Sequence, residues 1–137
     1  MTNTIDELEG HALNVAVAQA LGWTPGTGRK NGIWWASDGT HHRRIPPENE
    51  SASGASYMFD PAHNIATALD ELGSGWRWEY TETVEQQTRA RLLVVIVSFL
   101  GGHERSVVNF ADHPTKSSAY ATAHCRAFLK AQAAQSI

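Results

Sequence analysis

Cysteine is nearly absent from this chain, which limits the ways in which the fold can be held together. Cys125 is the one cysteine among 137 residues, so no disulfide can form within the chain. Small secreted domains depend on disulfides, whereas reducing compartments disfavour them. The hydrophobic share of 42% is enough for a core without such cross-links. We therefore expect a single domain over residues 1–137, in a reducing cytoplasm.

An excess of charge of either sign is also lacking. The chain has 11 basic and 14 acidic residues, which gives a formal charge of −3. This balance does not favour bulk nucleic acid or a membrane as a partner. The first residues are polar and acidic and do not have the pattern of a signal peptide, and no apolar run is as long as a membrane span. The sequence therefore predicts a soluble, cytoplasmic protein.

Catalytic and metal-binding motifs are missing too. Seven histidines are present, but none has HxH or HExxH spacing, and the adjacent His41 and His42 cannot easily both point at one ion. Cys125 follows His124, but successive residues on a helix point about 100° apart, which disfavours a nucleophile and its base. We expect Cys125 in the core, and we expect no catalytic residues, no metal and no cofactor.

The clearest pattern that is present is a helix between Phe59 and Gly73. Asp60 suits the cap position, where a carboxylate accepts hydrogen bonds from first-turn amides, and Pro61 suits the first helical position. Gly73 supplies the left-handed residue that ends a helix. The apolar positions of one face are Ile65, Ala68, Leu69 and Leu72. This spacing predicts that Leu69 lies at the centre of a buried stripe.

Two further helices are predicted at the ends of the chain. Thr4 and Glu7 form a capping box, and an apolar helical pattern continues from there to Gly22, which stops it. Near the C-terminus, Ser117 or Ser118 can cap a last helix. The residues expected to face inward from that helix are Cys125, Phe128 and Leu129.

The segments between the helices predict strands and one long loop. Residues 33–35 are short, aromatic and strand-like, and the polar residues from about 36 to 56 predict a loop too long for a simple connector. Three rings, those of Trp76, Trp78 and Tyr80, alternate with polar residues, so they share one face of a strand. That face is either core or interface.

A β-hairpin is predicted further along the chain. Its strands are residues 91–100 and 106–110, and Gly101-Gly102 begins the connection between them. The first strand is continuously apolar, which is typical of a central strand covered on both faces. With the helices above, this order predicts an α+β fold, an α/β sandwich whose antiparallel-rich sheet is covered by N-terminal, middle and C-terminal helices.

Three passages of the chain resemble the phage ABA sandwich domain family. They are residues 15–23 (VAVAQALGW), 64–72 (NIATALDEL) and 119–131 (AYATAHCRAFLKA), where His124 occupies an apolar position of the family pattern. The resemblance implies an α/β sandwich, a phage or prophage origin, and a small accessory role in the host cytoplasm. Together with the aromatic-rich sheet, it suggests a symmetric homo-oligomer, most simply a dimer.

One cationic cluster close to aromatic residues forms the candidate ligand-binding site. It comprises His41, His42, Arg43 and Arg44 in the long loop, with Trp34 and Trp35 nearby in sequence. Arginine binds phosphate through paired hydrogen bonds, and aromatic rings stack on bases. The alternative is a polar loop with solvated charges. The remaining candidates are Arg29 and Lys30 in a glycine-rich turn, and His63 in the first turn of the middle helix.

Together with the phage origin that the resemblance implies, these residues predict a non-enzymatic binding protein. Its partner would be a small anionic ligand, a nucleotide-derived signal of bacterial anti-phage defence, which the protein would sequester. An alternative is a protein-interaction module, in which the aromatic stripe and the long loop bind a host protein. An enzyme of unknown reaction is the third hypothesis.

Overall fold

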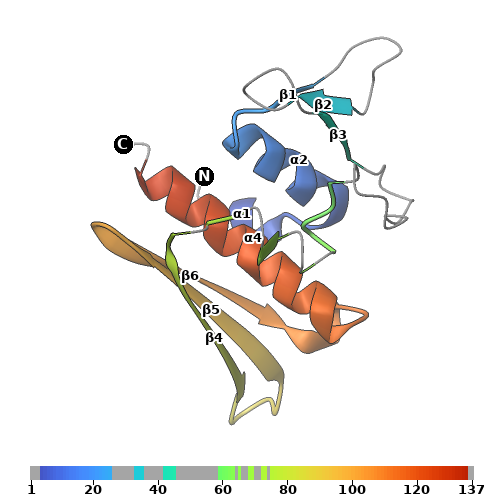
Figure 1. Ribbon diagram of the computed structural model, residues 1–137. Helices are drawn as coiled ribbons and strands as arrows, with labels where there is room; N and C mark the ends of the chain where they lie inside the picture. Colours follow the sequence, from blue (N-terminus) through green and yellow to red (C-terminus); the bar gives the residue numbers. More distant parts are fainter. Residues whose placement is uncertain are drawn as a thin grey trace.

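The computed structural model is an α+β fold in which the C-terminal helix packs on a three-stranded antiparallel sheet, and the N-terminal helices pack on the other side of that helix (Figure 1). This confirms the fold class predicted from the sequence. The structure describes residues 4–25, 33–35, 42–45, 59–63, 65, 68–69, 72–73 and 75–135.

The larger sheet has the strand order β4-β5-β6. The bounds of its strands are Arg77–Val84 (β4), Arg91–Phe99 (β5) and Gly102–Asn109 (β6). Leu100 and Gly101 form the turn between β5 and β6, where Gly101 has a φ of 100° that a side chain would disfavour. The predicted hairpin is therefore confirmed, although β6 begins at Gly102, four residues before the predicted start.

Helix α4 (Lys116–Gln135) lies across one face of this sheet (Figure 1). Four buried alanines, spaced four residues apart, form the side of α4 that contacts Leu93, Val95 and Val97 of β5: Ala119, Ala123, Ala127 and Ala131. Small side chains at i and i+4 let the helix axis approach the strands closely. The opposite side of α4 places Cys125, Phe128 and Leu129 in a second core, as the sequence predicts.

The cap of α4 differs from the prediction. Thr115, and neither Ser117 nor Ser118, precedes the first helical residue, and its Oγ1 accepts a hydrogen bond from the backbone N–H of Ser118 at 3.0 Å. Threonine is among the residues preferred at this position. The two candidate serines lie inside the first turn instead.

The N-terminal helix is broken in two, which corrects the prediction of one continuous helix from the capping box at Thr4. Helix α1 (Thr4–Glu7) ends before Leu8, and α2 (Gly10–Ala20) starts anew. Gly10 has a φ of 57°, which a right-handed helix cannot continue through. The guanidinium Nε of Arg126, on α4, donates to the carbonyl of Leu8 at 2.9 Å and so fixes the break. Gly22, with a φ of 83°, ends α2 as predicted.

The middle helix is confirmed at its described residues, but its buried face is not the predicted one. Ile65, Ala68 and Leu69 are helical, and Gly73 ends the segment with a φ of 77°. Ala68 and Leu72 are buried, whereas Leu69 is 49% exposed. The prediction that Leu69 lies at the centre of the stripe was therefore wrong, because the helix faces the core through the smaller Ala68.

The aromatic stripe of β4 belongs to the core. Trp76 and Trp78 pack against both the α2–α4 cluster and the α4–sheet cluster, so they join the two halves of the core. Tyr80 follows on the same face, with its ring 6.4 Å from that of Trp78. The three rings therefore pack against the core, and each keeps part of its surface exposed.

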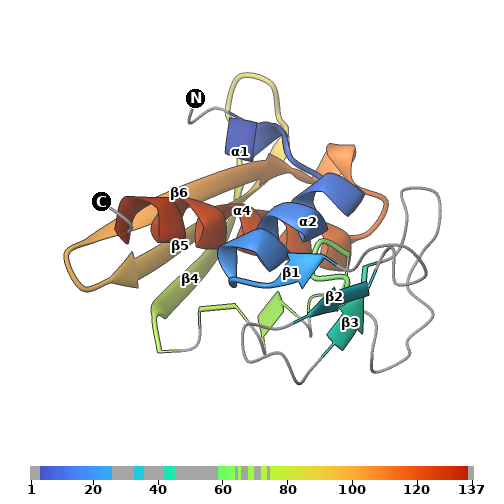
Figure 2. The same ribbon diagram turned by 90° about the horizontal axis from the view of Figure 1, so that it is seen from above.

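A second, smaller sheet is formed by three short strands that follow α2 in the sequence (Figure 2). Its strands are β1 (Thr24–Pro25), β2 (Ile33–Trp35) and β3 (His42–Arg44). The sequence predicts β2, but it predicts a turn at β1 and a loop from about 36 to 56, inside which β3 lies. Within that range, the residues other than 42–45 lie outside the described part of the chain.

The central strand β5 is fully covered on one face alone, which corrects the prediction of two covered faces. Leu93, Val95 and Val97 are buried beneath α4, whereas the alternate residues remain partly exposed. Among the elements that the structure describes, none packs on the outer face of this sheet. A continuous apolar run in the sequence therefore does not show whether one face or both faces of a strand are covered.

Candidate functional site

The structure brings most of the predicted cationic and aromatic residues together in the small sheet. In the antiparallel β2–β3 ladder, Trp34 lies directly opposite Arg43, Trp35 opposite His42, and Ile33 opposite Arg44. Opposite residues in such a ladder have Cα atoms about 4.5–5.5 Å apart. The sequence showed only that these residues are close along the chain, whereas the strand register shows which of them lie opposite one another. His41, Arg29 and Lys30 lie outside the described residues.

Among the predicted site residues, His63 is described together with its side-chain contacts. Its Nδ1 lies 2.8 Å from Oδ1 of Asp60, in the turn that precedes the middle helix. Asp60 is 2% exposed, whereas the His63 side chain is 53% exposed. Asp60 was expected to cap the helix through its carboxylate, but its Oδ1 instead receives hydrogen bonds from side chains.

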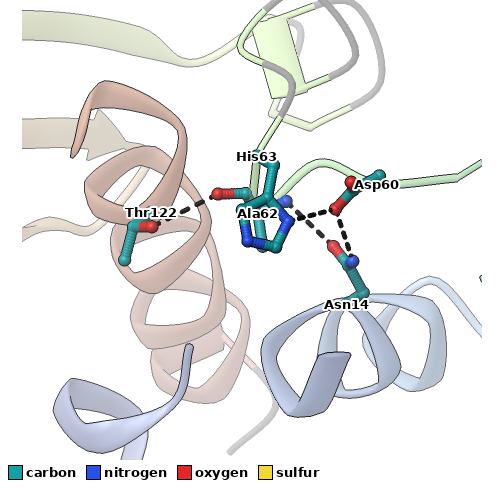
Figure 3. Close-up of polar contacts among 5 residues, drawn as sticks. All are labelled: Asn14, Asp60, Ala62, His63 and Thr122. Atoms are coloured by element: carbon teal, nitrogen blue, oxygen red, sulfur yellow. Dashed lines mark hydrogen bonds and ion pairs between the residues drawn. The ribbon is translucent and has the colours of Figure 1, made fainter. Parts of the chain in front are cut away.

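A buried polar network holds this turn against two helices (Figure 3). Asn14, on α2, donates from Nδ2 to Asp60 Oδ1 at 2.7 Å and accepts from the Ala62 backbone N–H at 2.8 Å. Thr122, on α4, donates to the Ala62 carbonyl at 3.2 Å. The turn is thereby fixed on both sides, and the orientation of the His63 ring is fixed with it.

His63 faces a hollow of about 250 Å³. Because Nδ1 contacts Asp60, Nε2 is the ring nitrogen left to meet a ligand there, and no described residue bonds it. Two acidic residues, Glu9 and Asp112, also line this hollow, and so does His113. Two carboxylates disfavour an anion, so the surroundings of His63 do not support its predicted role as an anion donor.

A basic pocket at the start of α4 was not found by sequence reasoning. It has a volume of about 260 Å³ and is lined by Arg91, Phe110, His113, Pro114, Thr115 and Lys116. Lys116 Nζ also lies 2.9 Å from Glu82 Oε2, so part of its charge is balanced. Burial and, secondarily, the charge of Arg126 lower the pKa of His113. The sequence predicts the turn before α4, but no pattern in it indicates that Arg91 of β5 lies beside that turn.

His124 and Cys125 do not form a reactive pair. Cys125 is fully buried, and this burial raises the pKa of its thiol, with the nearby charge of Asp60 adding to the effect. His124 Nδ1 lies 2.8 Å from the Tyr80 hydroxyl, and His124 Nε2 lies 3.1 Å from the Leu72 carbonyl. Burial lowers the pKa of His124 to about 4, although the bond to Leu72 acts in the opposite direction. Both side chains therefore have structural roles.

Metal binding and membrane insertion find no support in the described part of the chain. Among those residues, no group of three or more His, Cys, Asp or Glu side chains could hold a metal ion. None of the helices described is both long enough and apolar enough to cross a bilayer.

Comparison with known proteins adds no further identification. No protein-family model, no curated protein and no solved structure matches the chain.

Proposed function

We propose that this chain is a non-enzymatic protein that binds a small anionic, nucleotide-like ligand at the β2–β3 hairpin. The observation that carries the proposal is the register of this hairpin, which sets Trp34 directly opposite Arg43. Guanidinium groups bind phosphate through two parallel hydrogen bonds, and aromatic rings stack on bases. The ladder thus places both residue types that a nucleotide requires at directly opposite positions.

The wider biological role follows from the resemblance to phage ABA sandwich proteins. A phage protein that sequesters a nucleotide-derived signal would blunt a bacterial defence response. Such a protein acts in the host cytoplasm, and it needs a rigid scaffold and a binding site but no catalytic group. The α4–sheet core supplies that scaffold.

The register also places the two arginines on different faces of the hairpin, so they cannot contribute equally to one site. Successive residues of a strand alternate between the two faces of a sheet, so positions 43 and 44 belong to opposite faces of the hairpin. Position 43 shares its face with Trp34, whereas position 44 shares its face with Trp35 and His42. We therefore expect one of the two arginines to account for most of the binding energy, with the other as its matched control.

Calorimetric titration with a panel of cyclic and linear nucleotides tests the proposal. The wild type should bind at least one of them, and Arg43→Ala combined with Arg44→Ala should abolish that binding. Of the two single variants, one should weaken binding by about 1.5–3 kcal/mol, the usual value of a charge-assisted contact, and the other should change it little. Thermal melts of each variant check that the fold persists.

Two results would overturn the proposal. If wild-type protein binds none of the nucleotides, the protein-interaction hypothesis takes its place. If binding survives the double substitution but fails in Arg91→Ala combined with Lys116→Ala, the ligand occupies the basic pocket at the start of α4 and not the hairpin.

A further inference from the structure

The outer face of the β4–β5–β6 sheet is a surface on which none of the described elements packs. Its middle column, on β5, consists of Leu92, Val94 and Ile96, which alternate with the residues buried beneath α4. On the neighbouring strand β6, Val107 lies opposite Val94 and is 42% exposed. A hydrophobic centre on one side of a sheet is typical of a surface that contacts another protein.

Charged residues flank this centre in one particular row. The ladder sets Glu79 of β4 opposite Ile96 of β5, and it sets Ile96 opposite Arg105 of β6. The row therefore carries a negative charge on one edge strand, an apolar residue in the middle and a positive charge on the other edge strand. Glu79 Oε1 also lies 3.6 Å from Nη2 of Arg77 on the same strand, in an exposed ion pair that leaves Glu79 accessible to a second copy. It lies near the middle of the face, where the twist of a sheet displaces residues least.

This arrangement is self-complementary under a twofold rotation about an axis parallel to β5. Such a rotation places β5 of one copy on β5 of the second copy, and it places β4 of each copy over β6 of the other. Glu79 of one copy then faces Arg105 of the second copy, and the same pair recurs on the other side of the axis. Packed sheets lie about 10 Å apart, a distance that one glutamate and one arginine side chain together can span.

We propose that the outer face of this sheet is a dimer interface, occupied by a second copy of the chain in that face-to-face orientation. The proposal concerns the face opposite α4, so it does not rest on ligand binding at the hairpin.

The size of the face sets the strength that this dimer can have. From the ladder spacings, three strands of about eight residues cover roughly 14 Å by 26 Å, or about 400 Å² of flat sheet. Stable complexes bury about 800 Å² on each partner. We therefore expect a dimer that dissociates in the micromolar range, and its detection requires concentrations from about one to several hundred micromolar.

Sedimentation equilibrium with charge-swapped variants tests both the interface and its orientation. Glu79→Arg and Arg105→Glu should each raise the dimer dissociation constant at least tenfold, because two attractive pairs become two repulsive ones. The combined variant restores both pairs and should return the constant to within a few-fold of the wild-type value. Glu7→Arg, which makes the same charge change on α1, should leave the constant unchanged.

Three outcomes would overturn the proposal. A wild-type chain that stays monomeric at several hundred micromolar has no such interface. Single variants that dimerise as well as the wild type show that the pair does not form. Single variants that weaken the dimer without rescue by the combined variant show that the copies meet in another orientation. Circular dichroism melts establish that each variant is folded.

Discussion

The imidazole of His124 lies flat against the indole of Trp78, with ring centroids 3.7 Å apart and planes 17° apart. The tyrosyl hydroxyl of Tyr80 and the carbonyl of Leu72 satisfy the two nitrogens of the same imidazole. The carbonyl oxygen accepts a hydrogen bond from the Nε2–H group, which leaves Nδ1 to accept a hydrogen bond from the hydroxyl. This helix position thus holds a neutral histidine as a flat, fully bonded part of the core.

Acidification should therefore destabilise the protein through His124. Its pKa is about 4 in the fold against an ordinary value of 6.5, so the folded state binds fewer protons than the unfolded state between these values. The contribution of neutral His124 to the free energy of unfolding is fully present above pH 6.5. It is lost as the pH falls toward 4, and the total loss is about 3 kcal/mol. Urea denaturation at a series of pH values measures this.

Two histidine variants separate this effect from that of other groups. In His124→Gln most of the pH dependence between 6.5 and 4 should disappear. In His113→Gln most should remain, because His113 is only partly buried and the charges of Asp112 and Glu9 oppose the lowering of its pKa. Equal pH dependence in the wild type and in His124→Gln would contradict the prediction.

Gly73→Ala should destabilise the fold more than Gly75→Ala does. Both glycines have a positive φ, so each substitution carries the backbone strain of about 1–2 kcal/mol. A Cβ at Gly73 would also lie 2.5 Å from an atom of the Trp78 ring, whereas at Gly75 no atom of the described residues lies within 4 Å. Thermal melts of the two variants compare a clash plus strain with strain alone, and equal midpoints would show that Trp78 moves freely.

The two leucines of the middle helix should differ sharply. Leu72 is 1% exposed, so Leu72→Ala should cost about 2–5 kcal/mol of the free energy of unfolding. Leu69 is 49% exposed, so Leu69→Ala should cost less than about 1 kcal/mol. Chemical denaturation of both variants decides this, and a larger loss at Leu69 would mean that the face of the helix is assigned wrongly.

Asn14→Ala should be costly because it removes two buried hydrogen bonds at once. Asp60 would lose the donor at 2.7 Å, and the Ala62 N–H would lose its acceptor. Leaving buried polar groups unpaired costs about 1–3 kcal/mol, and more for a charged group. The matched control is Asn109→Ala, whose exposed side chain accepts one bond from the Ala111 N–H at 2.9 Å and should cost under about 1 kcal/mol. Similar losses in the two variants would show that the Asn14 network adds no stability.

Local sequence signals predicted the parts of the fold that depend on neighbouring residues. Glycine at the ends of two helices, the alternation along β4 and the hairpin of β5 and β6 all depend on residues a few positions apart. The side of the middle helix that is buried was not predictable in this way. Ala68 and Leu69 both fit an apolar stripe, and the packing of the rest of the protein selects between them.

The candidate site was predictable only in its composition. Arginines and tryptophans close in sequence indicated a binding segment, but their pairing across β2 and β3 depends on a ladder register that no local pattern specifies. The basic pocket joins Arg91 on β5 to Lys116 on α4, and Asn14 reaches Asp60 from a different helix. Contacts of this kind arise from the tertiary fold and leave no spacing signal in the chain.

The order of β4, β5, β6 and α4 along the chain also has a consequence for how the protein folds. These elements follow one another without interruption and form their own core, so their mutual contacts close short loops. Short loops cost less entropy to close, and chains rich in such contacts fold faster. The N-terminal helices join through contacts such as Arg126 with Leu8, from opposite ends of the chain. We therefore expect the C-terminal half to acquire structure first and to serve as the template on which α1 and α2 dock.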